Sequence, residues 1–210
     1  MKKSILFLLL LIFSVNIVIG QSTITKRSTM VIKFETATLA NGCFWCTEAI
    51  FQRLKGVESV QSGYTGGHLK NPSYSDITTG TTGHAEAIEI KFNPNIISFQ
   101  EILDVFFSTH DPTTLNRQGY DVGSQYRSAI FYHSNKQKET AEKFISELTK
   151  AQVFEGKIVT QIVPFTTFYT AENYHQNYYN NNKNQGYCVA VINPKLKKFI
   201  KKYKAKLKEE

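Results

Sequence analysis

Hydrophobic and polar positions alternate in several short stretches of the chain, and each stretch predicts a strand. From Ala87 to Phe92, apolar side chains at Ile88 and Ile90 alternate with charged ones, the period of two that marks a half-buried strand. Further strands are predicted at residues 31–39, 57–64, 125–133 and 157–163.

Helix signals separate these strands. Ser98 with Glu101 forms a capping box, a pair typical of a helix N-terminus, and predicts a helix over 99–108. Ser134 with Gln137 predicts a second capping box and a helix to about residue 150. Two more helices are predicted at 43–55, which Gly56 ends, and at 172–179.

The predicted order is strand, helix, strand, strand, helix, strand, helix. This order is typical of the α+β class, here a two-layer α/β sandwich with a ferredoxin-like core and a C-terminal extension. Residues 65–83 and 109–124 are long polar loops, and long loops inside a compact domain are often functional. We assign residues 31–194 to a single domain.

Residues 195–210 predict a basic C-terminal helix. An apolar stripe runs along it, and this pattern favours a helix docked on the domain by one face. The alternative is an amphipathic helix that contacts a membrane surface. The stripe consists of Leu196, Phe199, Ile200, Tyr203 and Leu207.

The first 20 residues have the pattern of a signal peptide. Lys2 and Lys3 precede an apolar run from Ile5 to Val15, and Gly20 lies before polar residues. The alternative is a retained membrane anchor, but the apolar run is short for a membrane span, so we favour cleavage near Gly20. We expect export to the periplasm or outside the cell, with residues 21–30 as a linker.

Most of the net positive charge lies in the C-terminal segment. Eight lysines and two glutamates lie between Lys195 and Glu210, so eight minus two, or six, of the net charge of +8 belong to the C-terminal segment. The remaining chain is almost neutral, and we therefore expect no nucleic-acid partner.

The three cysteines indicate redox chemistry. An odd number excludes a static disulfide framework, and three thiols do not complete a four-cysteine zinc site. Cys43 follows Gly42 at the predicted strand-to-helix turn, where a helix N-terminus is expected to lower the thiol pKa. Cys43 and Cys46 also form a C-x-x-C pair, and this spacing is consistent with a thioredoxin-like oxidoreductase. That alternative requires parallel alternating units, which the predicted order lacks.

A set of ordered motifs resembles the type A methionine sulfoxide reductases, a family of thiol enzymes. The resemblance covers about Thr36 to Lys197. The motifs are Gly42-Cys43-Phe44-Trp45, Ser62-Gly63-Tyr64-Thr65-Gly66-Gly67, Asn71-Pro72-Ser73-Tyr74, Thr82-Gly83-His84-Ala85-Glu86-Ala87, His110-Asp111-Pro112-Thr113, Gly123-Ser124-Gln125-Tyr126-Arg127-Ser128 and Glu172-Asn173-Tyr174-His175-Gln176.

The resemblance implies a role for each matched residue. Cys43 is then the nucleophile that attacks the sulfoxide sulfur, and Glu86 is the acid that protonates its oxygen. Glu86 shares strand parity with Ile88, so we expect its carboxyl to be buried and its pKa raised. The implied substrate-binding residues are Phe44 and Trp45 against the methyl group, Tyr74 and Tyr126 as donors to the oxygen, and Asp121 as a polar residue of the substrate site. A structural or a catalytic role for His175 remains open.

The resemblance also implies the reaction cycle. Reduction of the S epimer of methionine sulfoxide, in proteins or free, leaves a sulfenic acid on Cys43, and a second thiol then forms a disulfide. Cys188, in a segment that looks mobile, is preferred as this thiol, with Cys46 as the alternative. A thioredoxin-like dithiol then reduces the disulfide of a monomeric enzyme without metal or organic cofactor. A non-enzymatic alternative is an exported binding protein that uses its lysine-rich segment.

Overall fold

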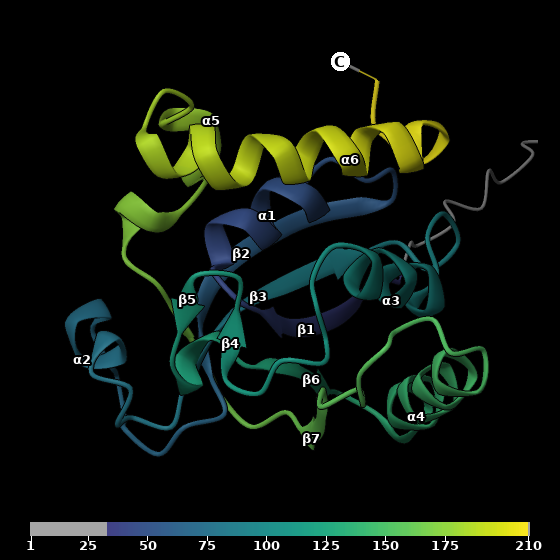
Figure 1. The fold of residues 1–210 in the computed structure, drawn as a ribbon, viewed down its shortest axis with the longest axis horizontal. Helices are drawn as coiled ribbons and strands as arrows, with labels where there is room; N and C mark the ends of the chain where they lie inside the picture. Colours follow the sequence, from purple (N-terminus) through teal and green to yellow (C-terminus); the bar gives the residue numbers. More distant parts are fainter. Residues whose placement is uncertain (1–32, 210) are drawn as a thin grey trace, which may run out of the picture. The chain divides into compact units, whose positions relative to one another are not determined.

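A six-stranded sheet forms the centre of the molecule (Figure 1). The computed structural model describes residues 33–209, so the predicted signal peptide and linker lie outside the described residues. The strands of the sheet are β1 (Glu35–Asn41), β2 (Val57–Thr65), β3 (Ala85–Phe92), β6 (Ser128–Tyr132), β7 (Gln161–Pro164) and β8 (Phe168–Thr170).

The strand order is β7-β6-β1-β3-β2-β8. In the middle, β6, β1, β3 and β2 pair antiparallel with their neighbours. If these four strands are numbered in chain order, their order across the sheet is 4-1-3-2, which is the ferredoxin-like arrangement. β7 adds to one edge in parallel and β8 to the other in antiparallel orientation. The predicted α+β class is confirmed.

The helices pack mainly on one face of the sheet. They are α1 (Phe44–Phe51), α2 (Tyr74–Thr78), α3 (Phe99–Ser108), α4 (Asn135–Lys150), α5 (Tyr178–Asn181) and α6 (Asn193–Tyr203). Leu39 and Ile88 of the sheet share one core with Ile50 of α1 and Phe106 of α3, and all four side chains are fully or almost fully buried. Removal of this apolar surface from water stabilises the helix-on-sheet layer pair.

The opposite face of the sheet is built from smaller side chains. Ala40, Ala87 and Ala129 surround Phe131, and partly buried residues such as Phe165 and Phe168 pack against them. Loops and edge strands therefore cover this face. The strand alternation, Leu39 to one side and Ala40 to the other, separates the two cores.

The two predicted capping boxes have different outcomes. Ser98 Oγ accepts the Glu101 N–H, and the Glu101 carboxylate accepts the Ser98 N–H at 2.9 Å, so the first box is confirmed. Ser134 caps α4, but the Gln137 side chain accepts from the His133 N–H and donates to the Thr36 carbonyl at 2.8 Å. The second box is therefore incomplete, because Gln137 connects α4 to β1 instead.

Several element boundaries differ from the predictions. α1 ends at Phe51 rather than at residue 55. The predicted strand at 125–133 starts only at Ser128, because residues 124–126 form a 3-10 turn. The helix predicted at 172–179 is broken at Asn177, whose φ of 53° is left-handed. The polar loops also contain short elements, namely α2 and the hairpin of β4 (Arg117–Gln118) and β5 (Asp121–Val122).

The C-terminal helix α6 docks on the domain. Leu196, Phe199 and Tyr203 are buried, and α6 lies over α1 (Figure 1). The Tyr203 hydroxyl donates to Asp104 of α3 at 2.8 Å. The preferred interpretation of a docked stripe is confirmed for these three residues, whereas Ile200 is exposed and does not belong to the buried face. Between residues 33 and 209, no helix has both the length and the apolar character to cross a membrane.

Candidate active site

A tight turn places Cys43 immediately before the first residue of α1. Gly42 connects β1 to the helix with a φ of 96°, and a Cβ at this position would lie 2.6 Å from the Cβ of Gln118. Glycine is therefore required both by the backbone conformation and by the close approach of the hairpin. Cys43 is the N-cap residue of α1, as the sequence predicts, and its carbonyl accepts the N–H of Cys46 at 3.2 Å.

A cavity of about 180 Å³ lies in front of Cys43. All of the predicted nucleophile, acid and substrate-binding side chains line it, together with one residue that the sequence analysis did not select. The lining residues are Cys43, Phe44, Trp45, Tyr74, Glu86, Asp121, Tyr126 and Tyr187.

Tyr187 is the residue that sequence reasoning missed. Its hydroxyl donates to the Asp121 carboxylate at 2.8 Å and lies 4.0 Å from the Cys46 sulfur. The available signal was its position next to Cys188, in a Gly-Tyr-Cys stretch whose cysteine alone attracted attention. Because the two residues that it contacts are far away in the sequence, only the fold shows its place in the site.

Glu86 is buried at the back of the cavity. It is 1% exposed, and its Oε2 accepts the Phe44 N–H, the first backbone donor of α1, at 3.0 Å. Burial raises the pKa of Glu86 to about 8, and the charge of Asp121 also raises it, while the Phe44 N–H opposes both. The expected inward carboxyl with a raised pKa is confirmed. At neutral pH Glu86 is mostly protonated and able to donate.

The thiol pKa of Cys43 does not follow the sequence expectation. Burial raises it, and Cys46 and the nearby Glu86 raise it further. The expected lowering by the helix N-terminus is wrong, because burial raises the thiol pKa and the Phe44 N–H bonds Glu86 rather than the sulfur. The Cys43 thiol instead donates to Cys46, which lowers the pKa of Cys46 to about 7, with a further contribution from Lys195.

The structure brings Cys46, and not Cys188, into contact with Cys43. Cys188 starts a π-helical turn (Cys188–Ile192) that leads directly into α6, and its side chain is fully buried. Its segment is therefore helical and packed, contrary to the mobile segment expected from sequence. Burial raises the pKa of Cys188. All three cysteines are free thiols.

Aromatic contacts hold the apolar wall of the cavity. The Trp45 ring stacks on Tyr178 at a centroid distance of 3.7 Å, and its indole N–H donates to Nδ1 of His175 at 3.0 Å. His175 is buried, which lowers its pKa, so the ring is neutral and carries its proton on Nε2. Nε2 lies 3.9 Å from the Glu172 carboxylate. These contacts give His175 a structural role that supports Trp45.

Two tyrosine hydroxyls face the same cavity as Glu86. Burial raises the pKa of Tyr74 to about 12 and also raises that of Tyr126, so both remain proton donors at neutral pH. The Tyr74 N–H donates to the Glu172 carboxylate at 2.8 Å, and the Tyr64 hydroxyl donates to the same carboxylate. Glu172 thus connects the start of α2 to β2.

The site combines a thiol, a protonated carboxyl, hydroxyl donors and an aromatic wall. If the Glu86 carboxyl and the two tyrosine hydroxyls bind a polar oxygen, the atom that carries this oxygen would lie near the Cys43 sulfur. Within residues 33–209, no group of three or more His, Cys, Asp or Glu residues has the arrangement of a metal site. The antiparallel pairing of β1 with both of its neighbours does not provide the parallel units that the thioredoxin-like alternative requires.

Comparisons with known proteins agree with this chemistry. A sequence model described as peptide methionine sulfoxide reductase matches residues 35–208, a range that includes α6. The peptide methionine sulfoxide reductase MsrA of Saccharolobus solfataricus is 55% identical over 174 residues, covering 83% of this chain and 97% of that protein. The MsrA of Deinococcus radiodurans is also 55% identical, covering 83% of this chain and 84% of that protein.

Solved structures give the same result. Reduced Mxr1 from Saccharomyces cerevisiae superimposes with a TM-score of 0.68 at 36% identity, covering 74% of this chain and 90% of that chain. Methionine sulfoxide reductase A of Corynebacterium diphtheriae has a TM-score of 0.68 at 33% identity, covering 71% of this chain and 75% of that chain.

Proposed function

Because the chain belongs to the peptide methionine sulfoxide reductase family and reduces methionine sulfoxide, we propose that Cys43 is its nucleophile and Glu86 its general acid. The observation that supports this proposal most directly is their shared cavity. Both residues line it, and the Phe44 N–H that follows Cys43 bonds the Glu86 carboxyl. The Cys43 sulfur and a protonated carboxyl therefore face the same bound group.

In the first step the Cys43 sulfur attacks the electrophilic sulfur of the sulfoxide. Glu86 donates its proton to the sulfoxide oxygen, and that oxygen is transferred from the methionine sulfur to the Cys43 sulfur. The substrate gains two electrons and leaves as methionine, while Cys43 loses two and becomes a sulfenic acid. The thiol proton of Cys43 restores the proton that Glu86 donates, so the protons balance.

The remaining cavity residues orient the substrate. Phe44 and Trp45 contact the methyl group, and the Trp45 ring is fixed for this by its stacking on Tyr178. Tyr74 and Tyr126 donate hydrogen bonds to the oxygen, and Asp121 is a further polar contact. Since the methyl wall and the oxygen donors lie around one thiol, only one epimer presents its sulfur correctly, and we assign this to the S epimer.

A second thiol then converts the sulfenic acid into a disulfide with loss of water. We propose Cys46 as this thiol, because it already contacts Cys43 and because Lys195 nearby favours its thiolate. A disulfide between residues three apart at a helix start is feasible, as in C-x-x-C enzymes. Cys188, preferred from sequence, is fully buried and lines neither the catalytic cavity nor the second cavity, which Cys43 and Cys46 both line.

Two single variants distinguish these thiols. With a protein dithiol as reductant, Cys46→Ser is expected to form about one methionine per enzyme and then stall, because its sulfenic acid is not resolved. Cys188→Ser is expected to continue to turn over. The measurement is methionine formed against time, with thiol counting at the plateau. The opposite pattern, in which Cys188→Ser stalls and Cys46→Ser continues, would assign resolution to Cys188.

A thioredoxin-like dithiol is the proposed electron donor for the disulfide, and the substrates are oxidised proteins and free methionine sulfoxide. The enzyme is proposed to act as a monomer. A disulfide formed at Cys43 and Cys46 would lie next to the surface cavity that both residues line, within reach of a partner thiolate.

Export is proposed from the N-terminal pattern of lysines, apolar run and Gly20. If the segment is a signal peptide, the protein from a periplasmic or culture fraction is expected to start near Gln21. N-terminal sequencing of that fraction is the measurement. An intact N-terminus in a membrane fraction would instead support the retained anchor.

A further inference from the structure

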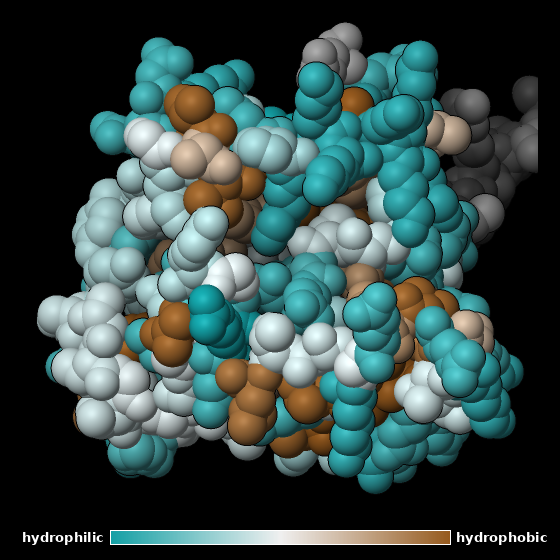
Figure 2. All heavy atoms as spheres, in the orientation of Figure 1, coloured by the Kyte–Doolittle hydropathy of each residue, from teal (hydrophilic) through white to brown (hydrophobic). Residues whose placement is uncertain are grey.

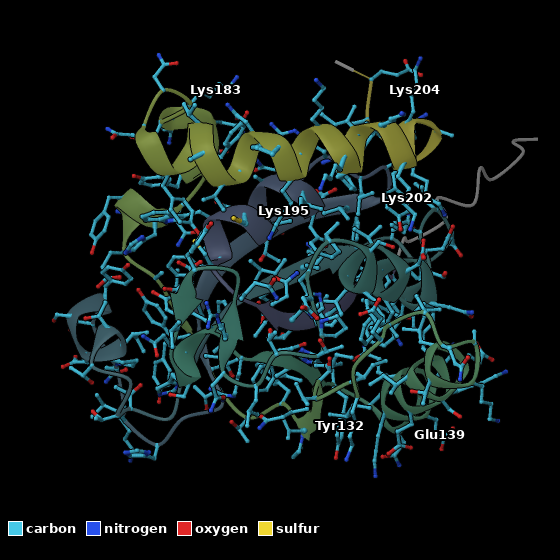
Figure 3. The ribbon with its side chains drawn as sticks, viewed as in Figure 1. Tyr132, Glu139, Lys183, Lys195, Lys202 and Lys204 are labelled. Carbon is cyan, nitrogen blue, oxygen red and sulfur yellow. The ribbon has the colours of Figure 1, made fainter. Side chains whose placement is uncertain are left out.

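Three lysines of α6 lie along one side of the helix. Lys195, Lys198 and Lys202 are spaced by three and four residues, and α6 places them beside α3 and the β4–β5 hairpin. In Figure 3, Lys195 and Lys202 extend on the side of α6 that faces the body of the protein, whereas Lys204 and Lys183 lie on the other. Within residues 33–209, none of the three groove-facing lysines forms an ion pair with a carboxylate.

These lysines line a groove of about 480 Å³, which we call the α6 groove. Its other side consists of the end of α3 and the loop after it. The lining residues are Ser108, Thr109, His110, Asp111, Gln118, Val191, Pro194, Lys195, Lys198, Phe199, Lys202 and Tyr203. Figure 2 shows this face, with hydrophilic atoms of α6 above hydrophobic atoms deeper in the surface.

The groove carries a net positive charge. Asp111 is its one carboxylate, and it already accepts hydrogen bonds from the Thr113 N–H and hydroxyl at 2.9 and 2.6 Å. His110 is neutral at physiological pH, because burial lowers its pKa to about 4. Lys202 donates to the Ser108 hydroxyl, which is a neutral partner. The three ammonium groups therefore outnumber the negative charge in the groove.

The α6 groove lies close to the active site, with one smaller cavity between them. A smaller cavity of about 250 Å³ shares Gln118, Val191 and Lys195 with the groove, and it shares Cys43, Asp121 and Tyr187 with the catalytic cavity. In Figure 3, Lys195 lies beside the yellow sulfur atoms at the start of α1. A chain whose sulfoxide side chain enters the catalytic cavity can thus continue along α6.

We propose that the α6 groove binds acidic side chains that flank the oxidised methionine of a polypeptide substrate. The proposal rests on the proposed function, since it names a substrate class for the same site. Lys195 and Lys202 are seven residues apart, about 10 Å along the helix. An extended peptide covers this length with about three residues. A concave groove close to the catalytic cavity suits such a segment better than the surface of a globular reductant.

The experiment compares two peptides that each contain one methionine S-sulfoxide. In the first pair, one peptide has three glutamates that start at the third residue after the sulfoxide, and the other has three glutamines at the same positions. In the second pair, the glutamates or glutamines precede the sulfoxide. With dithiothreitol as reductant, wild type is expected to reduce one glutamate peptide with a kcat/KM about threefold to tenfold higher than its glutamine partner. The preference should decrease with added salt.

A matched pair of variants locates the effect. Lys198→Gln with Lys202→Gln is expected to remove the preference, while kcat/KM for the glutamine peptides and for free methionine sulfoxide stays at the wild-type value. Lys197→Gln with Lys201→Gln removes the same charge from positions of α6 that do not line the groove, and is expected to keep the preference.

Three outcomes would overturn the inference. The first is equal kinetics for glutamate and glutamine peptides with wild type, and the second is an equal loss of preference in both double variants. The third is an unchanged preference in the Lys198 and Lys202 variant together with a raised KM for a thioredoxin-like reductant, which would assign the groove to the reductant. A failure to reduce free methionine sulfoxide would overturn the proposed function instead, so the two failures are distinguishable.

Discussion

Replacing Cys43 with serine is expected to abolish the reduction of methionine sulfoxide, including the first turnover. A serine hydroxyl does not ionise near neutral pH and does not form a sulfenic acid, so both the nucleophile and the oxygen acceptor are lost. The measurement is methionine formed per enzyme from each separate epimer, without reductant. Wild type is expected to convert about one equivalent of the S epimer under these conditions.

The position of Cys43 makes this variant easy to interpret. Cys43 is the N-cap residue of α1 and its side chain makes no capping hydrogen bond, whereas serine is a preferred N-cap residue. The variant should therefore fold at least as stably as wild type, which a thermal melt can check. Cys46→Ser is the matched control, since it removes the adjacent thiol and should still complete the first turnover. Methionine formation by Cys43→Ser at the wild-type rate would contradict the mechanism.

Glu86→Gln is expected to slow the chemical step by about 100-fold to 10,000-fold, the usual contribution of a positioned general acid. Glutamine keeps the size and the acceptor for the Phe44 N–H but has no acidic proton. The measurement is the single-turnover rate of methionine formation. Glu89→Gln on the same strand is the matched control, because Glu89 does not line the cavity, and its rate should not change.

The pH dependence provides a second test of Glu86. The carboxyl has to be protonated to donate, so kcat/KM is expected to fall as the pH rises through about 8. This falling limb should disappear in Glu86→Gln. A wild-type rate in that variant, or a limb that persists there, would show that the proton comes from another group.

The same raised pKa affects stability. The folded chain keeps a proton on Glu86 that the unfolded chain releases near pH 4.5, so the free energy of unfolding decreases as the pH rises from 4.5 towards 8. Glu86→Gln removes this contribution, and the variant should melt at a higher temperature than wild type above pH 8. A loss of activity in a more stable protein excludes misfolding as its cause.

The sequence was most informative where local rules decide the structure. The alternation around Ile88 and the Ser98 capping box both fix their elements through contacts within a few residues. The parity of Glu86 with Ile88 was enough to predict a buried carboxyl, since side chains two apart point to the same face. The resemblance in the ordered motifs then identified the nucleophile, the acid and the substrate-binding residues, and all of these line one cavity.

The features that were missed depend on contacts between distant parts of the chain. Tyr187 belongs to the site only because the segment before α6 packs against Asp121, 66 residues away. The raised pKa of Cys43 follows mainly from burial by the packed fold, and it is raised further by Glu86, which comes from β3. Asn177 interrupts a helical pattern because its own N–H and that of Tyr178 bond the buried Glu48 carboxylate. None of these pairings has a signal in a short window of sequence.

The hydrogen bond between the first amide of α1 and Glu86 has a consequence for proton donation. When the carboxyl gives up its proton, the resulting anion lies at the positive end of a helix and already has a donor in place. The helix that fails to activate the thiol therefore stabilises the conjugate base of the acid, and no group has to move for this to happen. A buried carboxyl can thus hold its proton at rest and still release it to a bound oxygen.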